Sequence, residues 1–336
     1  MLIDHSEVPL LLRRSHIHSG YRPLNQSLRY YVASAFRLHN ELINFWTHML
    51  PFFFIYFYFL HSEIFFEQEI RWPLVVLYSG ISVLFIASSF THLMHSRSQI
   101  DHIFWLLVDF SGILTFSLCV GLQRMSMREN SSSLFNNVYL CLLVVIVYLQ
   151  YWTTSGFFVV APFWRTRDLI RLFTCLSVAV ILYVPLLDRY FSRSTDLDPG
   201  LSLHSSAFIW LLISGIFMGA NIPECLAPGK FDYFCYGHQL FHLCIFMVVW
   251  NVCEGARLDA TSVNPDLLST KTELFPTVVK ILFFNAIGII GTIWLLVKIA
   301  KNKNNYVMTF NLEDDLYSTP IEVLKNPTPW GTKTEI

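Results

Sequence analysis

Six of the twelve histidines in the chain lie at or near the ends of long apolar runs, and they are His48, His92, His95, His102, His238 and His242. His238 and His242 form the stretch HQLFH, whose spacing places both imidazoles on one face of a helix. Two ring nitrogens placed in this way can bind one metal ion, and a third ligand must then come from another helix, for which His92 and His95 are the candidates. A buried hydrogen-bond network among these side chains is the alternative interpretation.

Asp109 lies about two turns into the apolar stretch IFWLLVDFSGILTF. A carboxylate at that depth of a membrane costs a few kcal/mol, unless a cation or a water-filled cavity is nearby. Three histidines and one water are the ligands of a zinc site with an open position, and Asp109 would hydrogen-bond that water or act as its base. Ser88 precedes His92 by one turn and would bond the same water or a substrate carbonyl. If the protein is a hydrolase, Asp109 and Ser88 are therefore its predicted catalytic residues.

The elements that position these residues are apolar helices. Of the 336 residues, 54% are hydrophobic and 14% are charged, and the mean hydropathy is +0.48. Soluble domains carry about 25% charged residues, so we expect an all-α, polytopic transmembrane helix bundle. Eight segments are apolar enough to span a membrane, and they cover about residues 43–60, 73–94, 103–122, 134–156, 169–187, 206–222, 234–252 and 278–299. We expect seven of them to form the core, with the last as an additional C-terminal helix.

Most of the 23 Lys and Arg residues fall in loops that share one side of the membrane with the N-terminus. This bias predicts that both termini are cytoplasmic and that all six histidines lie in one cytoplasmic layer. Residues 1–41 would form a cytoplasmic segment that contains an amphipathic surface helix, with a stripe of Leu28, Tyr31, Val32, Ala35 and Phe36. Residues 42–300 would form the transmembrane domain, and residues 301–336 would form a cytoplasmic tail.

Two further groups of polar residues lie in the predicted turns of this layer. Asp101 and His102 are expected in the solvated interface, where charge costs little. Glu224 and Asp232 flank the turn in NIPECLAPGKFDYF and are expected to cap helices and to be solvated.

Several stretches in order carry a family resemblance: SGYRP, NELINFWTH, Ser88 four residues before His92, Asp109 17 positions after His92, then IPE, APGKFD and HQLFH. Together they cover about residues 19 to 250, and the chain thereby resembles the progestin and adipoQ receptor family. This family is related to the hemolysin III-type proteins and the alkaline ceramidases, and it includes the adiponectin receptors.

The resemblance implies seven transmembrane helices with a cytoplasmic N-terminus. It also implies a zinc ion near the cytoplasmic side, with His92, His238 and His242 as its ligands and Ser88 and Asp109 as adjoining polar residues. The sequence His92-xx-His95-Ser96 is shorter than the HxxxxHS of adiponectin receptors, so the chain looks more like the membrane progestin receptors. His95 is left as an alternative ligand.

On this resemblance we expect a plasma-membrane receptor that contains Zn²⁺ and binds a steroid of the progestin type. The alternative is a zinc-dependent, ceramidase-like lipid amidase, which could also serve receptor signalling, and a transporter is a third option. The expected partners are a steroid or sphingolipid ligand, the lipid bilayer, and a G protein or adaptor. The net charge of −1 argues against nucleic acid as a partner.

Overall fold

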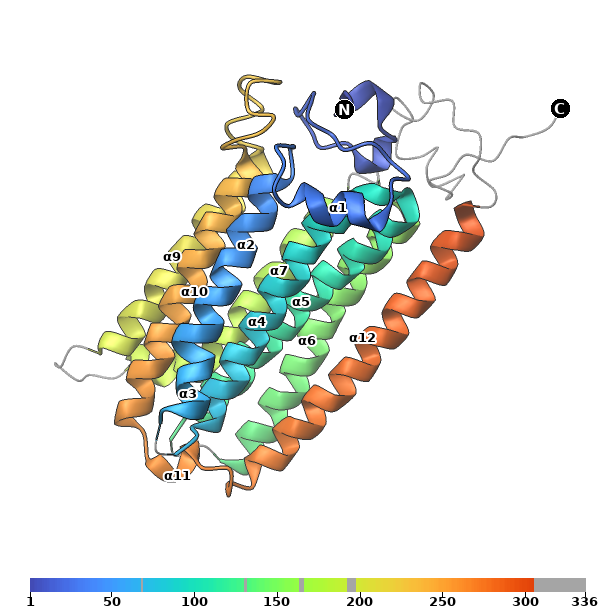
Figure 1. The fold of residues 1–336 in the computed structure, drawn as a ribbon. Coiled ribbons are helices and arrows are strands. Elements are labelled where there is room, and N and C mark those ends of the chain that lie inside the picture. Colours follow the sequence, from blue (N-terminus) through green and yellow to red (C-terminus); the bar gives the residue numbers. More distant parts are fainter. Residues whose placement is uncertain (68, 130–131, 163–165, 192–197, 305–336) are drawn as a thin grey trace.

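Long helices run side by side through the computed structural model, which describes residues 1–67, 69–129, 132–162, 166–191 and 198–304 (Figure 1). The long helices are α2 (Leu42–Ile55), α4 (Trp72–Met94), α5 (Gln99–Ser126), α6 (Ser133–Val160), α7 (Thr166–Tyr183), α9 (Pro199–Ala220), α10 (Gly237–Ser262) and α12 (Leu274–Asn304). Shorter elements are α1 (Leu28–Ser34), α3 (His61–Phe65), α8 (Leu187–Phe191) and α11 (Pro265–Leu268). A π-helical turn, Tyr56–Leu60, joins α2 to α3 into one span.

Eight helical segments of the described residues have the length and hydropathy of membrane spans. The predicted all-α transmembrane bundle is therefore confirmed, whereas the assignment of its ends to the two sides of the membrane stays a prediction. Both the segment before α2 and the end of α12 lie at the same end of the bundle (Figure 1). We call this end the N-terminal face. The predicted tail lies outside the described residues from position 305 onward.

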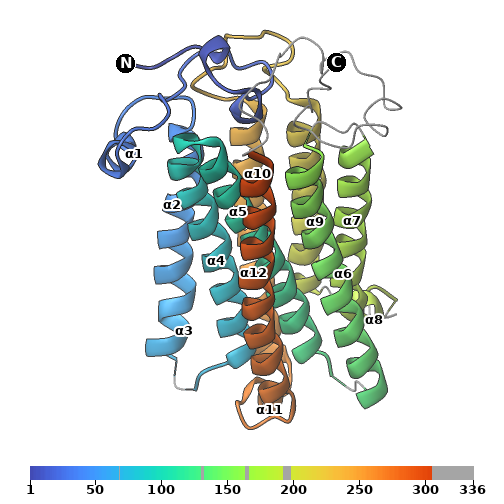
Figure 2. The ribbon, with the colours of Figure 1, turned by 90° about the vertical axis from the view of Figure 1, so that its right-hand side faces the viewer.

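Two apolar cores hold the bundle together. In the first, α2, α4, α9 and α10 meet around fully buried side chains such as Phe85 and Val249. In the second, α5, α6, α7 and α12 meet around residues such as Leu122 and Leu143. α12 packs against α5 and α6 from the outside and is the least buried of the spans (Figure 2). This arrangement agrees with the expectation of seven core helices and one additional helix.

The segment before α2 folds across the N-terminal face. Its helix α1 is capped by Ser27, whose hydroxyl accepts a hydrogen bond from the Tyr30 amide (3.3 Å). The predicted apolar stripe is divided, because Tyr31 and Ala35 pack into the bundle. The other three members, Leu28, Val32 and Phe36, are exposed, as a helix on a membrane surface requires.

Among the helices that extend beyond their predicted ends, α5, α9 and α10 do so around a buried polar network. Sequence patterning ends the third span near 122, starts the sixth near 206 and ends the seventh near 252, because polar residues follow. In the structure Arg124, His204 and Asp259 are buried and bond to one another: His204 Nδ1 lies 3.2 Å from Arg124, and its Nε2 lies 2.9 Å from Asp259 Oδ2. Because these polar groups satisfy each other, the helices continue through them.

The connection between α9 and α10 links the N-terminal segment to the bundle. Glu224 Oε2 accepts a hydrogen bond from the Gly237 amide (2.6 Å) and so caps α10, as expected, although Glu224 is buried and not solvated. Asp232 is also buried, and its carboxylate accepts hydrogen bonds from the amides of His18 (2.9 Å) and Ser19 (2.8 Å). The expected solvation of both carboxylates was therefore wrong.

Candidate metal centre

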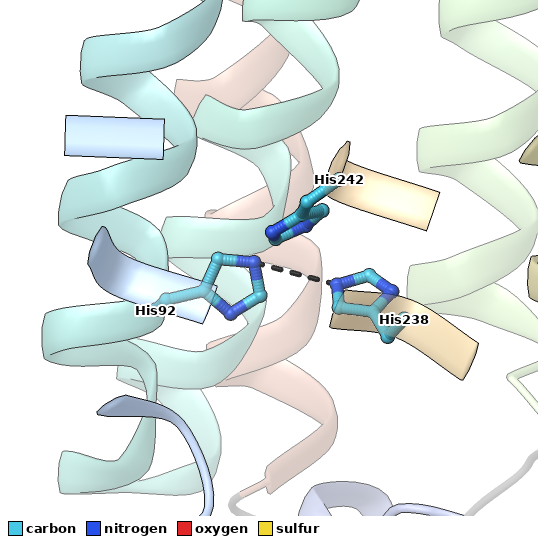
Figure 3. A group of neighbouring side chains, drawn as sticks. All are labelled: His92, His238 and His242. Atoms are coloured by element: carbon cyan, nitrogen blue, oxygen red, sulfur yellow. Dashed lines mark hydrogen bonds between the residues drawn. The ribbon is translucent and has the colours of Figure 1, made fainter. Parts of the chain in front are cut away.

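Three histidines from two helices lie near the N-terminal face, and their side chains point toward one another in Figure 3. His92 lies in the last turn of α4, and His238 and His242 lie in the first two turns of α10. The Nε2 atoms of His92 and His238 are 3.4 Å apart, and one ligand atom from each of the three residues lies within 4.8 Å of the others. The structure thus brings together the three predicted ligands, in an arrangement that could hold a metal ion.

The outer nitrogen of each histidine contacts a partner. His92 Nδ1 lies 2.7 Å from Glu41 Oε2, and His238 Nδ1 lies 3.2 Å from the Met218 sulfur. His242 Nδ1 lies 2.9 Å from the Thr47 hydroxyl. Partners of this kind fix the ring orientation and the tautomer of metal-binding histidines.

The neighbours of Thr47 and Glu41 determine which nitrogen carries the proton. The Thr47 hydroxyl donates to the carbonyl of Ile43 (2.8 Å), so its oxygen is left to accept a proton from His242 Nδ1. The Glu41 carboxylate can only accept, so His92 Nδ1 also carries a proton. In the neutral form of both rings the lone pair is then on Nε2, which is the state that metal binding requires.

Glu41, for which no role was predicted, bonds to the residues on the polar side of this site. It is buried, and it bonds to His92, to Arg14 (Nη2–Oε1 3.0 Å) and to Asn44 (Nδ2–Oε2 2.5 Å). Burial by itself would raise its pKa, but the Arg14 charge and the hydrogen bonds from the histidines hold that pKa well below its usual range. A polar stripe of Glu41, Asn44 and His48 at spacings of three and four residues was the signal that could have found it.

Arg22 fixes the end of α4 that carries His92. Its guanidinium is buried and donates to the carbonyls of Leu93 (2.6 Å) and His92 (2.7 Å), and also to Ser34 and Ser96. These carbonyls belong to the helix end, where the chain itself offers no partner. Burial lowers the pKa of Arg22 to about 10, so the group remains charged at neutral pH.

The two predicted catalytic residues lie beside His92. Ser88 is buried one turn before His92 on α4. Asp109 is half-buried on α5, and its carboxyl group interacts with the Ser88 side chain and with His92. The structure therefore brings both side chains to the histidine centre, whereas their roles stay predictions.

The other three histidines of the predicted layer lie around this centre. His48 stacks on His242 with ring centroids 3.7 Å apart, and His95 Nδ1 lies 3.0 Å from His102 Nδ1. His102 is buried against Phe158. The expectation that it lies in the solvated interface was wrong, because His95 and Phe158 of α6 pack against its ring.

Glu41, His92 and His95 form a second group with metal-ligand spacing. The Glu41 carboxylate already bonds to Arg14, and Arg22 lies close to His92 and Ser96, so two positive charges oppose a cation here. In the group of His92, His238 and His242, no ring nitrogen bonds to a cationic side chain or to a partner that Arg14 holds, apart from the Glu41 contact of His92, among the residues that the structure describes. The neutral nitrogens of this group fit a metal that prefers imidazole ligands.

A helical membrane protein with a three-histidine centre at one end of its bundle is the class that fold and site define. Residues 36–252, more than half of the chain, match the family described as Haemolysin-III related, and the chain belongs to this family.

The chain is also similar to membrane progestin receptors of human and mouse. The chain is 27% identical to human membrane progestin receptor alpha over 278 residues, which is 78% of this chain and 76% of that protein. It is 28% identical to mouse membrane progestin receptor gamma over 292 residues, covering 81% and 86% of the two chains. The chain is 25% identical to human membrane progestin receptor beta, over 76% of this chain and 75% of that protein. The predicted resemblance to the progestin and adipoQ receptor family is confirmed.

Proposed function

We propose that this protein is a plasma-membrane receptor for a steroid of the progestin type, with a zinc ion held by His92, His238 and His242. The observation that carries the receptor proposal is the similarity to membrane progestin receptors over about four fifths of the chain. The observation that carries the zinc proposal is the convergence of three imidazoles whose outer nitrogens all have partners. Signalling through a G protein or an adaptor belongs to the same proposal.

In this receptor, the histidine centre would join α4 to α10 at the N-terminal face. His92 lies 146 residues before His238 in the chain, so their shared ligand would fix the relative position of two distant helices. A steroid that changes the packing of these helices would then change the N-terminal segment, because Arg22 bonds to the end of α4 and Asp232 bonds to residues 18 and 19.

A second candidate function, amide hydrolysis of a ceramide-type lipid, is favoured by the position of Ser88 and Asp109 beside His92. Zinc bound at three histidines would polarise a carbonyl and lower the pKa of a bound water. The Asp109 carboxylate would accept a proton from the attacking water, while the Ser88 hydroxyl would donate to the carbonyl oxygen. The water oxygen would bond to the carbonyl carbon, the C–N bond would break, and the proton would pass from Asp109 to the leaving amine.

Metal content tests the centre itself. We expect about one zinc per purified chain, and we expect a His92→Ala/His242→Ala double variant to lose it. A His5→Ala/His61→Ala variant, which removes two histidines that belong to neither metal-ligand group, should keep the metal. Unchanged zinc in the first variant would refute the site.

Two assays separate the functions. A receptor should bind labelled progesterone saturably in lipid nanodiscs, and an amidase should release fatty acid from labelled ceramide. Release that is lost in both Asp109→Asn and His238→Ala would establish the hydrolase. Steroid binding without release would establish the receptor alone, and failure of both assays with folded, zinc-loaded protein would refute both functions.

A further inference from the structure

His48 lies on α2 beside the histidine centre, and neither of the two functions considered above assigns it a role. The residue is buried, with 3% of its surface exposed. Both of its ring nitrogens are buried as well, and neither bonds to a residue that the structure describes. In that part of the chain, His48 is the one histidine for which this holds at both nitrogens. The ring therefore has hydrogen-bonding capacity that the rest of the described protein does not use.

Packing alone gives no reason for an imidazole at this position. The His48 ring stacks on His242, with centroids 3.7 Å apart, and makes a T-shaped contact with Phe85, with centroids 5.2 Å apart. A phenylalanine ring makes both kinds of contact without burying polar atoms. A buried nitrogen without a partner costs free energy, because its hydrogen bond to water is lost and not replaced. A partner from outside the chain would explain why an imidazole occupies this position.

The face of α2 that carries His48 lies against the histidine centre. Glu41 precedes His48 by seven residues, which is about two helical turns, so the two side chains share one face. Glu41 contacts His92, and Thr47, the residue before His48, contacts His242. The ring centroid of His48 lies 6.5 Å from that of His92. His48 therefore borders the centre on its α2 side.

His48 lies beside the expected metal ligands and is not one of them. Among the described residues, it belongs to neither group whose ligand atoms lie within 4.8 Å of one another. Its neutral ring offers one N–H donor and one acceptor nitrogen. A carbonyl oxygen can only accept, so it is a suitable partner for this donor.

We propose that His48 donates a hydrogen bond to the carbonyl oxygen of a lipid that binds at the histidine centre. The carbonyl is a ketone in a steroid of the progestin type and an amide in a ceramide. His48 is thus a residue that positions the bound molecule. The inference rests on the proposed zinc centre, since the metal and His48 act on the same ligand.

The test uses the full chain in lipid nanodiscs, loaded with cobalt(II) as a coloured substitute for zinc. Acetohydroxamic acid, a small carbonyl compound that binds metal ions, is titrated while the visible absorption is recorded. The test variants are His48→Phe, which keeps an aromatic ring, and His48→Leu, which removes it. The matched control is His61→Phe, the same exchange at a histidine that packs among aromatic rings at the other end of the span. Thermal unfolding establishes that each variant is folded.

We expect both test variants to keep the cobalt affinity within about threefold and to bind the hydroxamate about tenfold more weakly, whereas the control binds both as wild type does. Wild-type hydroxamate affinity in His48→Phe would leave the residue a packing role only. Loss of cobalt from both test variants would make it a metal ligand. Either result overturns the proposal. A wild-type chain that takes up no metal refutes the zinc centre itself, and the inference falls with it.

Competition in wild-type protein identifies the source of the carbonyl. Displacement of the hydroxamate by progesterone identifies a ketone, and displacement by palmitoyl ceramide identifies an amide. The lipid that competes should do so about tenfold more weakly in His48→Phe, relative to the same lipid in wild type. Failure of both lipids to displace the hydroxamate overturns the proposal.

Discussion

Replacement of Glu41 by Gln tests whether the polar contacts behind the histidines control metal binding. The substitution keeps the size of the side chain but removes the charge that Arg14 and His92 share. The amide can retain one acceptor for His92 Nδ1, yet its NH₂ group then points at donors of Arg14 or Asn44. We therefore expect the orientation of His92 to be lost for much of the time.

The magnitude follows from the contacts. Loss of the hydrogen-bond partner of a metal-binding histidine lowers the metal affinity by about 10- to 100-fold, or about 1.4 to 2.8 kcal/mol. The free energy of unfolding without metal should fall by about 1 to 3 kcal/mol. This is less than for a fully buried ion pair, because the Arg14 side chain is 25% exposed.

The assay is a titration of purified protein with zinc in a chelator buffer, combined with thermal unfolding at fixed free zinc. The control is Glu63→Gln, because Glu63 is also buried and bonds to Arg71 with both oxygens (2.8 and 2.6 Å), but at the other end of the bundle. Both variants should lose stability, and only Glu41→Gln should lose zinc affinity. Wild-type zinc affinity in folded Glu41→Gln would refute the role assigned to this carboxylate.

Three further results are expected. Thr47→Val removes the acceptor of His242 Nδ1 and should lower the zinc affinity by up to about tenfold in the same titration. Unchanged affinity would show that this contact is dispensable. Asp259→Asn leaves His204 without its anion and should lower the free energy of unfolding by about 2 to 4 kcal/mol with zinc affinity intact; a stability loss under 0.5 kcal/mol would contradict the buried network. Burial, aided by the Arg22 charge, holds the pKa of His39 at about 3 in the folded protein. As the pH falls below about 6.5, His39 therefore becomes protonated in the unfolded chain but not in the folded protein, and this favours unfolding. His39 should then lower the free energy of unfolding by about 2 kcal/mol between pH 7 and pH 5. The His39→Gln variant should lack this contribution when its unfolding curves at the two pH values are compared with those of wild type.

Much of the bundle could be predicted because each membrane span is a continuous apolar run in the sequence. Counting spans also assigned each helix end to a side, and this placed His92, His238 and His242 in one layer. The ring contacts of the structure confirm that layer. The spacing of HQLFH was informative because helix geometry alone puts its two imidazoles together.

Glu41 and the true helix ends could not be predicted in the same way, because both depend on partners that are distant in the chain. The role of Glu41 depends on Arg14, in a segment without regular periodicity, and on His92, 51 residues later. Asp259 continues α10 only because His204 and Arg189 satisfy its carboxylate. The local sequence pattern predicts a solvated loop at such residues, because it contains no information about a partner on another helix.

The bonds of the N-terminal segment have a consequence for biosynthesis. Residues 18 and 19 bond to Asp232, a carboxylate that lies 214 residues after His18 in the chain. At about 5 to 20 residues per second, roughly 10 to 45 s pass between synthesis of the two partners. During this interval the segment has left the ribosome but its docking site has not been made, and two of the three histidines of the centre, His238 and His242, do not yet exist. A metal ion held by these three histidines could therefore load only after the seventh span is inserted, which would make its acquisition one of the last steps in maturation of the protein.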